Sequence, residues 1–304
     1  MVKNNPDPNG RDGTWGSREA AAEYLRGAAA RAEVFGPATE RMLALANMRL
    51  GSRVLDVGAG AGDQILAAAR RVGPTGFVLA TDISTSMLET AAALAREAGL
   101  SNVGTQVMDA QDLELPADSF DAVISRNALM LIPDIHKALS EMRRVLRSGG
   151  RTAAIVFSTP EKCPYLSIPH TIARRVGRLT SPPAEQFGEF RLSGAGVMEQ
   201  AYRNAGFRDV VIQEFPTRRR FPSLAQAMQY MRGPLPLREL MARLSETERE
   251  QAWAEIEEAL RQFVGPNGYD SPCELLIGVG TKKSGFSRWS SRMLREFQQA
   301  AEVW

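Results

Sequence analysis

Short apolar segments alternate with amphipathic segments over residues 53–157, and this alternation predicts most of the fold. These segments occupy residues 53–57, 77–81, 103–108, 120–125 and 152–157, and all but 103–108 are mostly apolar. Between several of them, apolar side chains recur at helical spacing, as in 65–70, 84–98 and 134–146. Strands that alternate with helices form a parallel sheet covered by helices on both faces. Right-handed crossovers then bring the loops after the first four strands to one edge of the sheet.

The pattern changes on both sides of this region. Residues 1–16 are polar and rich in Asn, Asp, Pro and Gly, so we expect them to be disordered, whereas residues 17–50 predict a cap of N-terminal helices. After the core at 51–158, residues 159–283 contain two further strands, at 210–215 and 275–280, and a helical insert at 223–263. The expected fold is therefore α/β, with a mostly parallel sheet of seven strands whose last strand is antiparallel.

Residues 284–304 predict an amphipathic C-terminal helix. We expect its apolar face to pack on the domain or to form a homodimer contact with a second copy of the chain. Association with a membrane surface is less favoured, because the polar face mixes Arg with Glu and Gln. The apolar face consists of Trp289, Met293, Phe297, Ala300 and Trp304.

Composition narrows the classes of protein. Hydrophobic residues make up 44% of the 304 residues and the formal net charge is only +2, which is typical of a globular protein and argues against a nucleic-acid partner. The two cysteines, Cys163 and Cys273, are too few for a disulfide framework or a metal cluster, so we expect free thiols and no metal site. The chain has no apolar run typical of a signal peptide or a stable membrane span, which predicts a cytoplasmic protein.

Residues 54–63, VLDVGAGAGD, carry the most specific signal in the chain. A buried strand ends near an acidic residue, three glycines alternate, and a helix begins. Such a turn lets backbone N–H groups and the helix N-terminus approach a ligand closely. The dinucleotide fingerprint G-x-G-x-x-G would require glycine where Asp63 stands, so an NAD-dependent oxidoreductase is disfavoured. A simple structural turn is the alternative for this segment taken by itself.

Four segments together resemble the Rossmann-like class I methyltransferases that depend on S-adenosylmethionine (SAM), within the small-molecule branch similar to the ubiquinone and menaquinone methyltransferases. They are VLDVGAGAG (54–62), ATDISTSML (80–88), MDAQDLELPADSFDAVIS (108–125) and LRSGGR (146–151), and a looser similarity continues through AGF at 205–207. The resemblance implies that 51–158 is a SAM-binding core and that 159–283 caps the substrate.

The resemblance also implies roles for single residues. Asp82, at the end of the second strand, would accept hydrogen bonds from the ribose hydroxyls, with helix capping as the alternative. Asp56 and the glycine loop would hold the amino-acid end of SAM, and Tyr24 would close over the cofactor or simply pack in its helix. The predicted cofactor-binding set is Asp56, Gly58, Gly60, Gly62, Asp82, Ile83 and Met87 (against the adenine), Asp109 (to the adenine amino group), Ala110, Gln111, Ser125, Arg126, Asn127 and Tyr24.

Catalytic residues are less clearly indicated. Relatives often carry His where this chain has Met130, and His136 begins a helix and is expected to be exposed. The candidates are His170, as a general base or in a surface or capping role, and Arg126, as a partner for a carboxylate or as a solvated loop charge. Arg218-Arg219-Arg220 could steer an acidic substrate, with a solvated charge run as the alternative.

The predicted function is methyl transfer from SAM, by in-line displacement, to a small and largely apolar acceptor such as a quinone, polyketide or terpenoid, leaving S-adenosylhomocysteine (SAH). Two alternatives of other classes stay open. One is a protein of the same fold that uses SAM as a scaffold for a cyclase or decarboxylase reaction. The other is a catalytically silent SAM-binding module.

Overall fold

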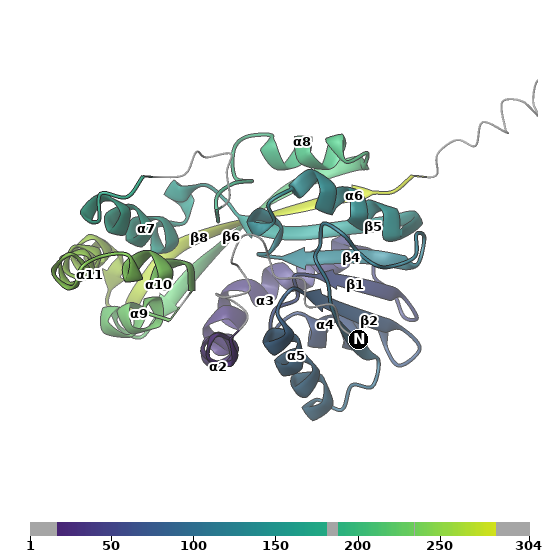
Figure 1. The fold of residues 1–304 in the computed structure, drawn as a ribbon, viewed down its shortest axis with the longest axis horizontal. Coiled ribbons are helices and arrows are strands. Elements are labelled where there is room, and N and C mark those ends of the chain that lie inside the picture. The colour runs from purple at the N-terminus through teal and green to yellow at the C-terminus, as the bar shows by residue number, and fades with distance from the viewer. Residues whose placement is uncertain (1–16, 181–187, 234, 284–304) are drawn as a thin grey trace, which may run out of the picture.

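The computed structural model describes residues 17–180, 188–233 and 235–283. A single twisted sheet runs through the molecule, with helices on both of its faces and a group of helices gathered at one end (Figure 1). The segment 1–16 and the C-terminal helix expected at 284–304 lie outside the described residues. None of the helices in the described ranges is long and apolar enough to cross a membrane.

The sheet has the order β3-β2-β1-β4-β5-β8-β6, and a short strand β7 pairs with β8. Neighbours from β3 to β5 are parallel, whereas β8 is antiparallel to both β5 and β6. The predicted sheet is confirmed, with one short strand added. The strands are β1 (Arg53–Val57), β2 (Phe77–Asp82), β3 (Val103–Val107), β4 (Phe120–Arg126), β5 (Leu146–Phe157), β6 (Arg208–Phe221), β7 (Val264–Gly265) and β8 (Gly268–Thr281).

Helices cover the two faces separately. On one face, α3 (Ala28–Leu45), α4 (Ile65–Val72) and α5 (Thr85–Glu97) bury an apolar core against the strands, while α6 (Ile135–Val145) and α8 (Val197–Asn204) do so on the other (Figure 1). Successive strand residues alternate between these cores: Val54 belongs to the first and Leu55 to the second. Helix α2 (Arg18–Arg26) lies against α5 at the edge where β1 and β2 end.

Strands β6 and β8 are much longer than their apolar segments predict. They remain paired through Phe221 and Tyr269, beyond the part of β8 that pairs with β5. Because residues 217–220 are polar, the hydrophobic pattern of the sequence does not predict that the strand continues through them. The projecting two-stranded ribbon carries a third apolar core, which contains residues from α7 (Pro164–Val176), α9 (Leu224–Met231), α10 (Leu235–Ala242) and α11 (Glu246–Leu260). We call this ribbon and its helices the cap.

Candidate active site

The glycine loop connects β1 to α4 and is shaped by left-handed backbone. Gly58, Gly60 and Gly62 have φ angles of 68°, 55° and 93°. A Cβ on Gly58 would lie 2.3 Å from the Cβ of Ala128, and one on Gly62 would lie 2.9 Å from that of Ala91. Two of the three glycines therefore allow close packing of the loop. Gly60 faces outward beneath the ring of Tyr24, at 3.9 Å from its added Cβ.

Asp82 joins the end of β2 to this loop. Its Oδ2 accepts a hydrogen bond from the Gly60 N–H at 2.9 Å, and its Oδ1 accepts one from the Ser84 N–H at 2.9 Å. Burial raises the pKa of Asp82, although these backbone donors oppose the shift. A carboxylate has about four acceptor positions, more than these backbone donors occupy, so it can still accept from a ligand. Because Ser84, not Asp82, caps α5, the helix-capping alternative for Asp82 is not what the structure shows.

The predicted adenine residues divide into exposed and buried ones. The Ile83 side chain is 39% exposed beside Asp82, whereas Met87 is buried together with Ala21, Ala61 and Tyr24. Asp109 is exposed, and its carboxylate accepts hydrogen bonds from Gln111 through both its backbone and its side chain, at 2.8–3.0 Å.

Three buried polar atoms near the ends of β1 and β4 have no hydrogen-bond partner: Asp56 Oδ2, Ser125 Oγ and Asn127 Oδ1. Asp56 Oδ1 accepts from Gln64 Nε2 at 2.9 Å, and burial raises the pKa of Asp56 to about 7. Unpartnered buried acceptors are costly unless something donates to them. An ammonium group carries three donors and a positive charge, so the amino-acid end of SAM fits this set of residues.

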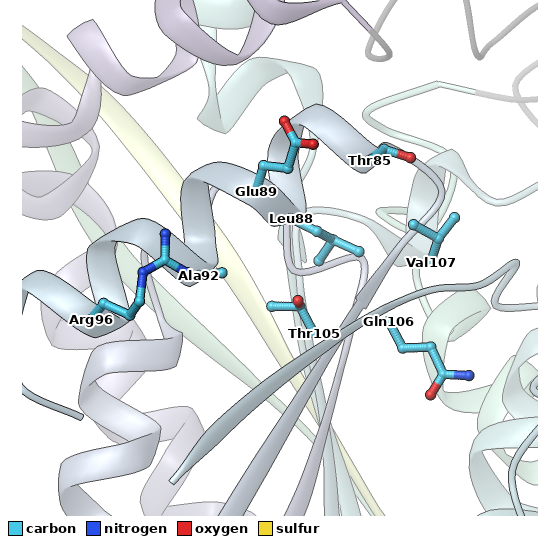
Figure 2. A pocket seen from close by; sticks show the side chains of 8 residues that line it. All are labelled: Thr85, Leu88, Glu89, Ala92, Arg96, Thr105, Gln106 and Val107. Atoms are coloured by element: carbon cyan, nitrogen blue, oxygen red, sulfur yellow. The ribbon is translucent and has the colours of Figure 1, made fainter. Parts of the chain in front are cut away.

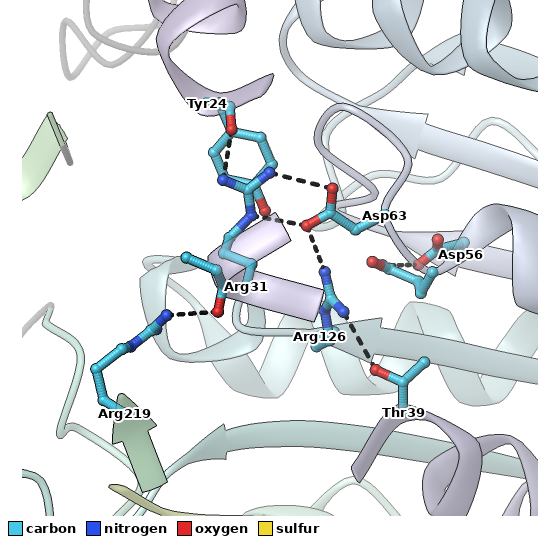
Figure 3. A network of polar contacts seen from close by, with 9 residues as sticks. Tyr24, Arg31, Thr39, Asp56, Asp63, Arg126 and Arg219 are labelled. Carbon is cyan, nitrogen blue, oxygen red and sulfur yellow. Dashed lines mark hydrogen bonds and ion pairs between the residues drawn. The ribbon is translucent and has the colours of Figure 1, made fainter. Parts of the chain in front are cut away.

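Asp63 forms the centre of a buried ion-pair network (Figure 3). Arg31 on α3 donates to it from Nε at 2.7 Å and from Nη2 at 3.1 Å, and Arg126 at the end of β4 donates from Nη2 at 2.9 Å. Arg126 Nη1 also donates to Thr39 Oγ1 at 3.1 Å. The two guanidinium groups hold the pKa of Asp63 below its ordinary value, against the opposing effect of burial.

In the sequence, Asp63 serves only to exclude a dinucleotide site, and no pattern points to Arg31. No spacing rule links a helix residue to a loop residue thirty-two positions later. Arg126 was predicted to pair with a carboxylate of SAM or of the substrate; here it pairs with Asp63, and pairing with a ligand stays a prediction. The Tyr24 ring lies on Arg31, with the guanidinium carbon 3.4 Å from the ring centroid.

The histidines lie apart from this network. His136 is exposed, as expected. His170 is on α7 in the cap, where its Nδ1 lies 2.8 Å from the Leu166 carbonyl oxygen and its Nε2 lies 3.5 Å from Glu189 Oε1. Its role as a base stays a prediction. Met130 is buried in the core beneath α6. Among the described residues, no group of three or more His, Cys, Asp or Glu side chains is arranged to hold a metal ion.

A surface pocket of about 260 Å³ lies between α5 and β3 (Figure 2). None of the predicted cofactor residues lines it. The lining residues are Thr85, Leu88, Glu89, Ala92, Arg96, Thr105, Gln106 and Val107.

This chain is similar to known proteins in both sequence and fold. The family model described as "Methyltransferase domain" matches residues 49–175. Nocamycin O-methyltransferase of Saccharothrix syringae is 34% identical over 190 residues, which cover 59% of this chain and 67% of that protein. Aklanonic acid methyltransferase DauC of Streptomyces sp. (strain C5) is 38% identical over 42% of this chain and 57% of its own length. Demethylmenaquinone methyltransferase of Geobacillus kaustophilus is 31% identical over 56% of this chain and 76% of its own length.

Solved structures extend the likeness to the whole fold. The YcgJ protein of Bacillus subtilis superposes with a TM-score of 0.55 at 23% identity, over 81% of this chain and 98% of its own. The cyclase SpnF superposes with a TM-score of 0.51 at 21% identity, over 82% of each chain. At these identities the likeness concerns the fold alone. The sequence relatives decide the class: the chain belongs to the class I SAM-dependent methyltransferases, whose cofactor is SAM.

Proposed function

We propose that this protein transfers the methyl group of SAM to a small, largely apolar organic acceptor such as a quinone, polyketide or terpenoid. The observation that carries the proposal is the set of unpartnered buried acceptors at the ends of β1 and β4, next to Asp82 and the glycine loop. The relatives support methyl transfer by their names, one of which includes a quinone, demethylmenaquinone.

The residues of the core would orient the cofactor. SAM supplies an activated methyl group on a sulfonium, so the protein has to align the acceptor and exclude water. The remaining acceptor positions of Asp82 would bind the ribose hydroxyls. Asp56, Ser125 and Asn127 would accept from the ammonium group, and Ile83 would lie against the adenine.

Other residues would close the site. Helix α2 places Tyr24 over Gly60, and the Asp63 network ties α3 to the glycine loop, so this side of the site is screened from water. Asp109 and the backbone of Ala110 and Gln111 would complete the adenine contacts. A proton acceptor is needed only where the acceptor atom carries a proton, and His170 stays the candidate.

The acceptor would lie on the cap side, near the contact between α3 and the ribbon of β6 and β8. The cap contains an aromatic cluster with ring centroids 5.2–6.4 Å apart: Tyr165, Phe221, Tyr230 and Tyr269. Such rings match a flat, apolar molecule.

Two measurements test this function. Calorimetric titration with SAH should show binding at micromolar to sub-millimolar concentrations, and incubation with radiolabelled SAM and a panel of quinones and polyketides should form SAH and labelled product together. An acceptor consumed without SAH formation would instead support the scaffold alternative. Binding without turnover across small molecules, with labelling of nucleic acid or protein, would overturn the acceptor class.

A further inference from the structure

The middle arginine of the run 218–220 is buried while its neighbours are exposed. Arg219 is 4% exposed and stands opposite Ser271 in the ribbon. Arg218 and Arg220 point to the other face, where both pair with Asp270, at 2.6 and 3.5 Å. The alternation of a strand thus turns one charge of the run inward, into the cap.

Arg219 has no carboxylate partner among the described residues. Its Nη1 donates to the Ala30 carbonyl oxygen at 2.8 Å, and its Nε has no hydrogen-bond partner. Burial raises the pKa values of the Tyr165 and Tyr269 hydroxyls, and the charge of Arg219 opposes this rise. A hydrogen bond with Cys163, helped by the same charge, lowers the pKa of the Cys273 thiol. None of these is a carboxylate, so the buried charge is not matched by an opposite charge of the usual kind.

Aromatic rings surround this charge. The guanidinium carbon lies 5.1 Å from the ring centroid of Tyr165, 5.3 Å from that of Tyr230 and 5.7 Å from that of Phe35. Cation–π contacts offset part of the cost of burying a guanidinium, but they leave the Nε edge without an acceptor. The buried hydroxyl of Tyr165 also has no hydrogen-bond partner. The Tyr269 hydroxyl beside it is likewise unpartnered, so three unsatisfied donors lie within an aromatic enclosure.

The enclosure adjoins the cofactor side of the molecule. Phe35 on α3 lies between the two cations, with its ring centroid 5.4 Å from the guanidinium carbon of Arg126 and 5.7 Å from that of Arg219. Arg219 also bonds to Ala30, the residue before Arg31 of the Asp63 network (Figure 3). A molecule held at Arg219 would thus lie one ring away from Arg126, which is predicted to bind the cofactor.

We propose that Arg219 binds the carboxylate of a flat, conjugated acceptor, with its Nε edge as the donor and the Tyr165 hydroxyl as a further donor. This rests on the proposed function and specifies its substrate class as an aromatic carboxylic acid. The planar edge of a guanidinium matches the two oxygens of a carboxylate, and the aromatic rings match the conjugated body. Arg218 and Arg220, neutralised by Asp270 at the surface, have no such role.

The test compares two probes of one shape. Full-length protein saturated with SAH is titrated with anthraquinone-2-carboxylate and with the neutral anthraquinone-2-carboxamide, and binding is followed by fluorescence. The wild type should bind the carboxylate about 10- to 100-fold more tightly than the carboxamide. Arg219→Met should abolish this preference and leave carboxamide binding within about twofold. The surface control Arg218→Met should keep the preference.

The outcomes separate this proposal from the function on which it rests. Failure of SAH to bind the wild type would overturn the proposed function itself. With SAH bound, equal affinity for the two probes, or no carboxylate binding at millimolar concentration, would overturn only the role of Arg219. A purely structural Arg219 predicts that Arg219→Met lowers the melting temperature and keeps the preference. A charge held for a ligand predicts an unchanged or raised melting temperature without ligand.

Discussion

Two buried arginine sites in this protein differ in what balances their charge. At the glycine loop, Arg31 and Arg126 share the carboxylate of Asp63 at 2.7–3.1 Å. In the cap, Arg219 is buried to a similar degree, but its described neighbours are aromatic rings and a backbone carbonyl. The first site is complete without a ligand, whereas the second leaves donors unused.

The matched charges at the glycine loop and the unmatched charge in the cap suit different tasks. A matched ion-pair network holds its geometry whether or not the cofactor is bound, so it can position the loop and α3 in advance. An unmatched charge in an apolar enclosure favours a ligand that brings the opposite charge.

The largest expected effect is on stability at the glycine loop. Asp63→Ala leaves two buried guanidinium groups without their partner, so it should lower the free energy of unfolding by about 3–5 kcal/mol. The matched control is Asp270→Ala in the cap, whose surface pairs with Arg218 and Arg220 are 41–55% exposed and should contribute at most about 1 kcal/mol. Urea denaturation measures both variants, and equal losses would contradict the assignment of Asp63 as the centre of the network.

The next effect concerns the cofactor. Asp82→Asn removes the charged acceptor that we propose for the ribose, so it should weaken SAH binding by about 10- to 100-fold in calorimetry. Asp109→Asn should weaken it less, because Asp109 is exposed and water competes for its hydrogen bonds. Thermal unfolding of both variants controls for loss of folding. A larger effect of Asp109 would reverse the proposed order of the two carboxylates.

The core could be predicted from the sequence because its signals are local. The strand β1, the glycine turn and Asp82 follow one another in patterns that short-range geometry imposes. Asp63, Arg31 and Arg219 could not be assigned in this way, because their partners are distant in the chain or are aromatic rings from several elements. In the run 218–220, only the pairing of β6 with β8 decides which arginine turns inward.

A third effect depends on pH. Burial raises the pKa of Asp56 to about 7 in the free protein, well above its ordinary value of 3.8. Between these two values the folded state binds more protons than the unfolded state, so the contribution of Asp56 to stability falls as pH rises. The ammonium group of the cofactor favours ionised Asp56, so binding should release a proton below about pH 7.

SAH affinity should therefore rise by up to about tenfold per pH unit between pH 5.5 and 6.5 and level off above pH 7. Asp56→Asn should remove this share of the pH dependence, while any part that belongs to Asp82 remains. Calorimetry in two buffers of different ionisation enthalpy would detect the released proton directly. If the wild-type affinity for SAH did not depend on pH, Asp56 would not lose a proton when the cofactor binds.

The smallest expected effect is on local stability, and it tests whether the cap and the core unfold together. Ser84 caps α5 in the core, and Ser245 caps α11 in the cap through a capping box with Glu248, so each Ser→Ala change should cost about 1 kcal/mol. Helix α5 packs on β2 and β3, whereas α11 packs on α7 and α9. Amide hydrogen exchange should therefore show that Ser84→Ala lowers protection throughout the sheet, while Ser245→Ala lowers it only in the cap helices. Equal loss of protection in β1 and β4 for both variants would mean that the cap opens only with the whole domain, and that the acceptor side cannot open independently of the cofactor side.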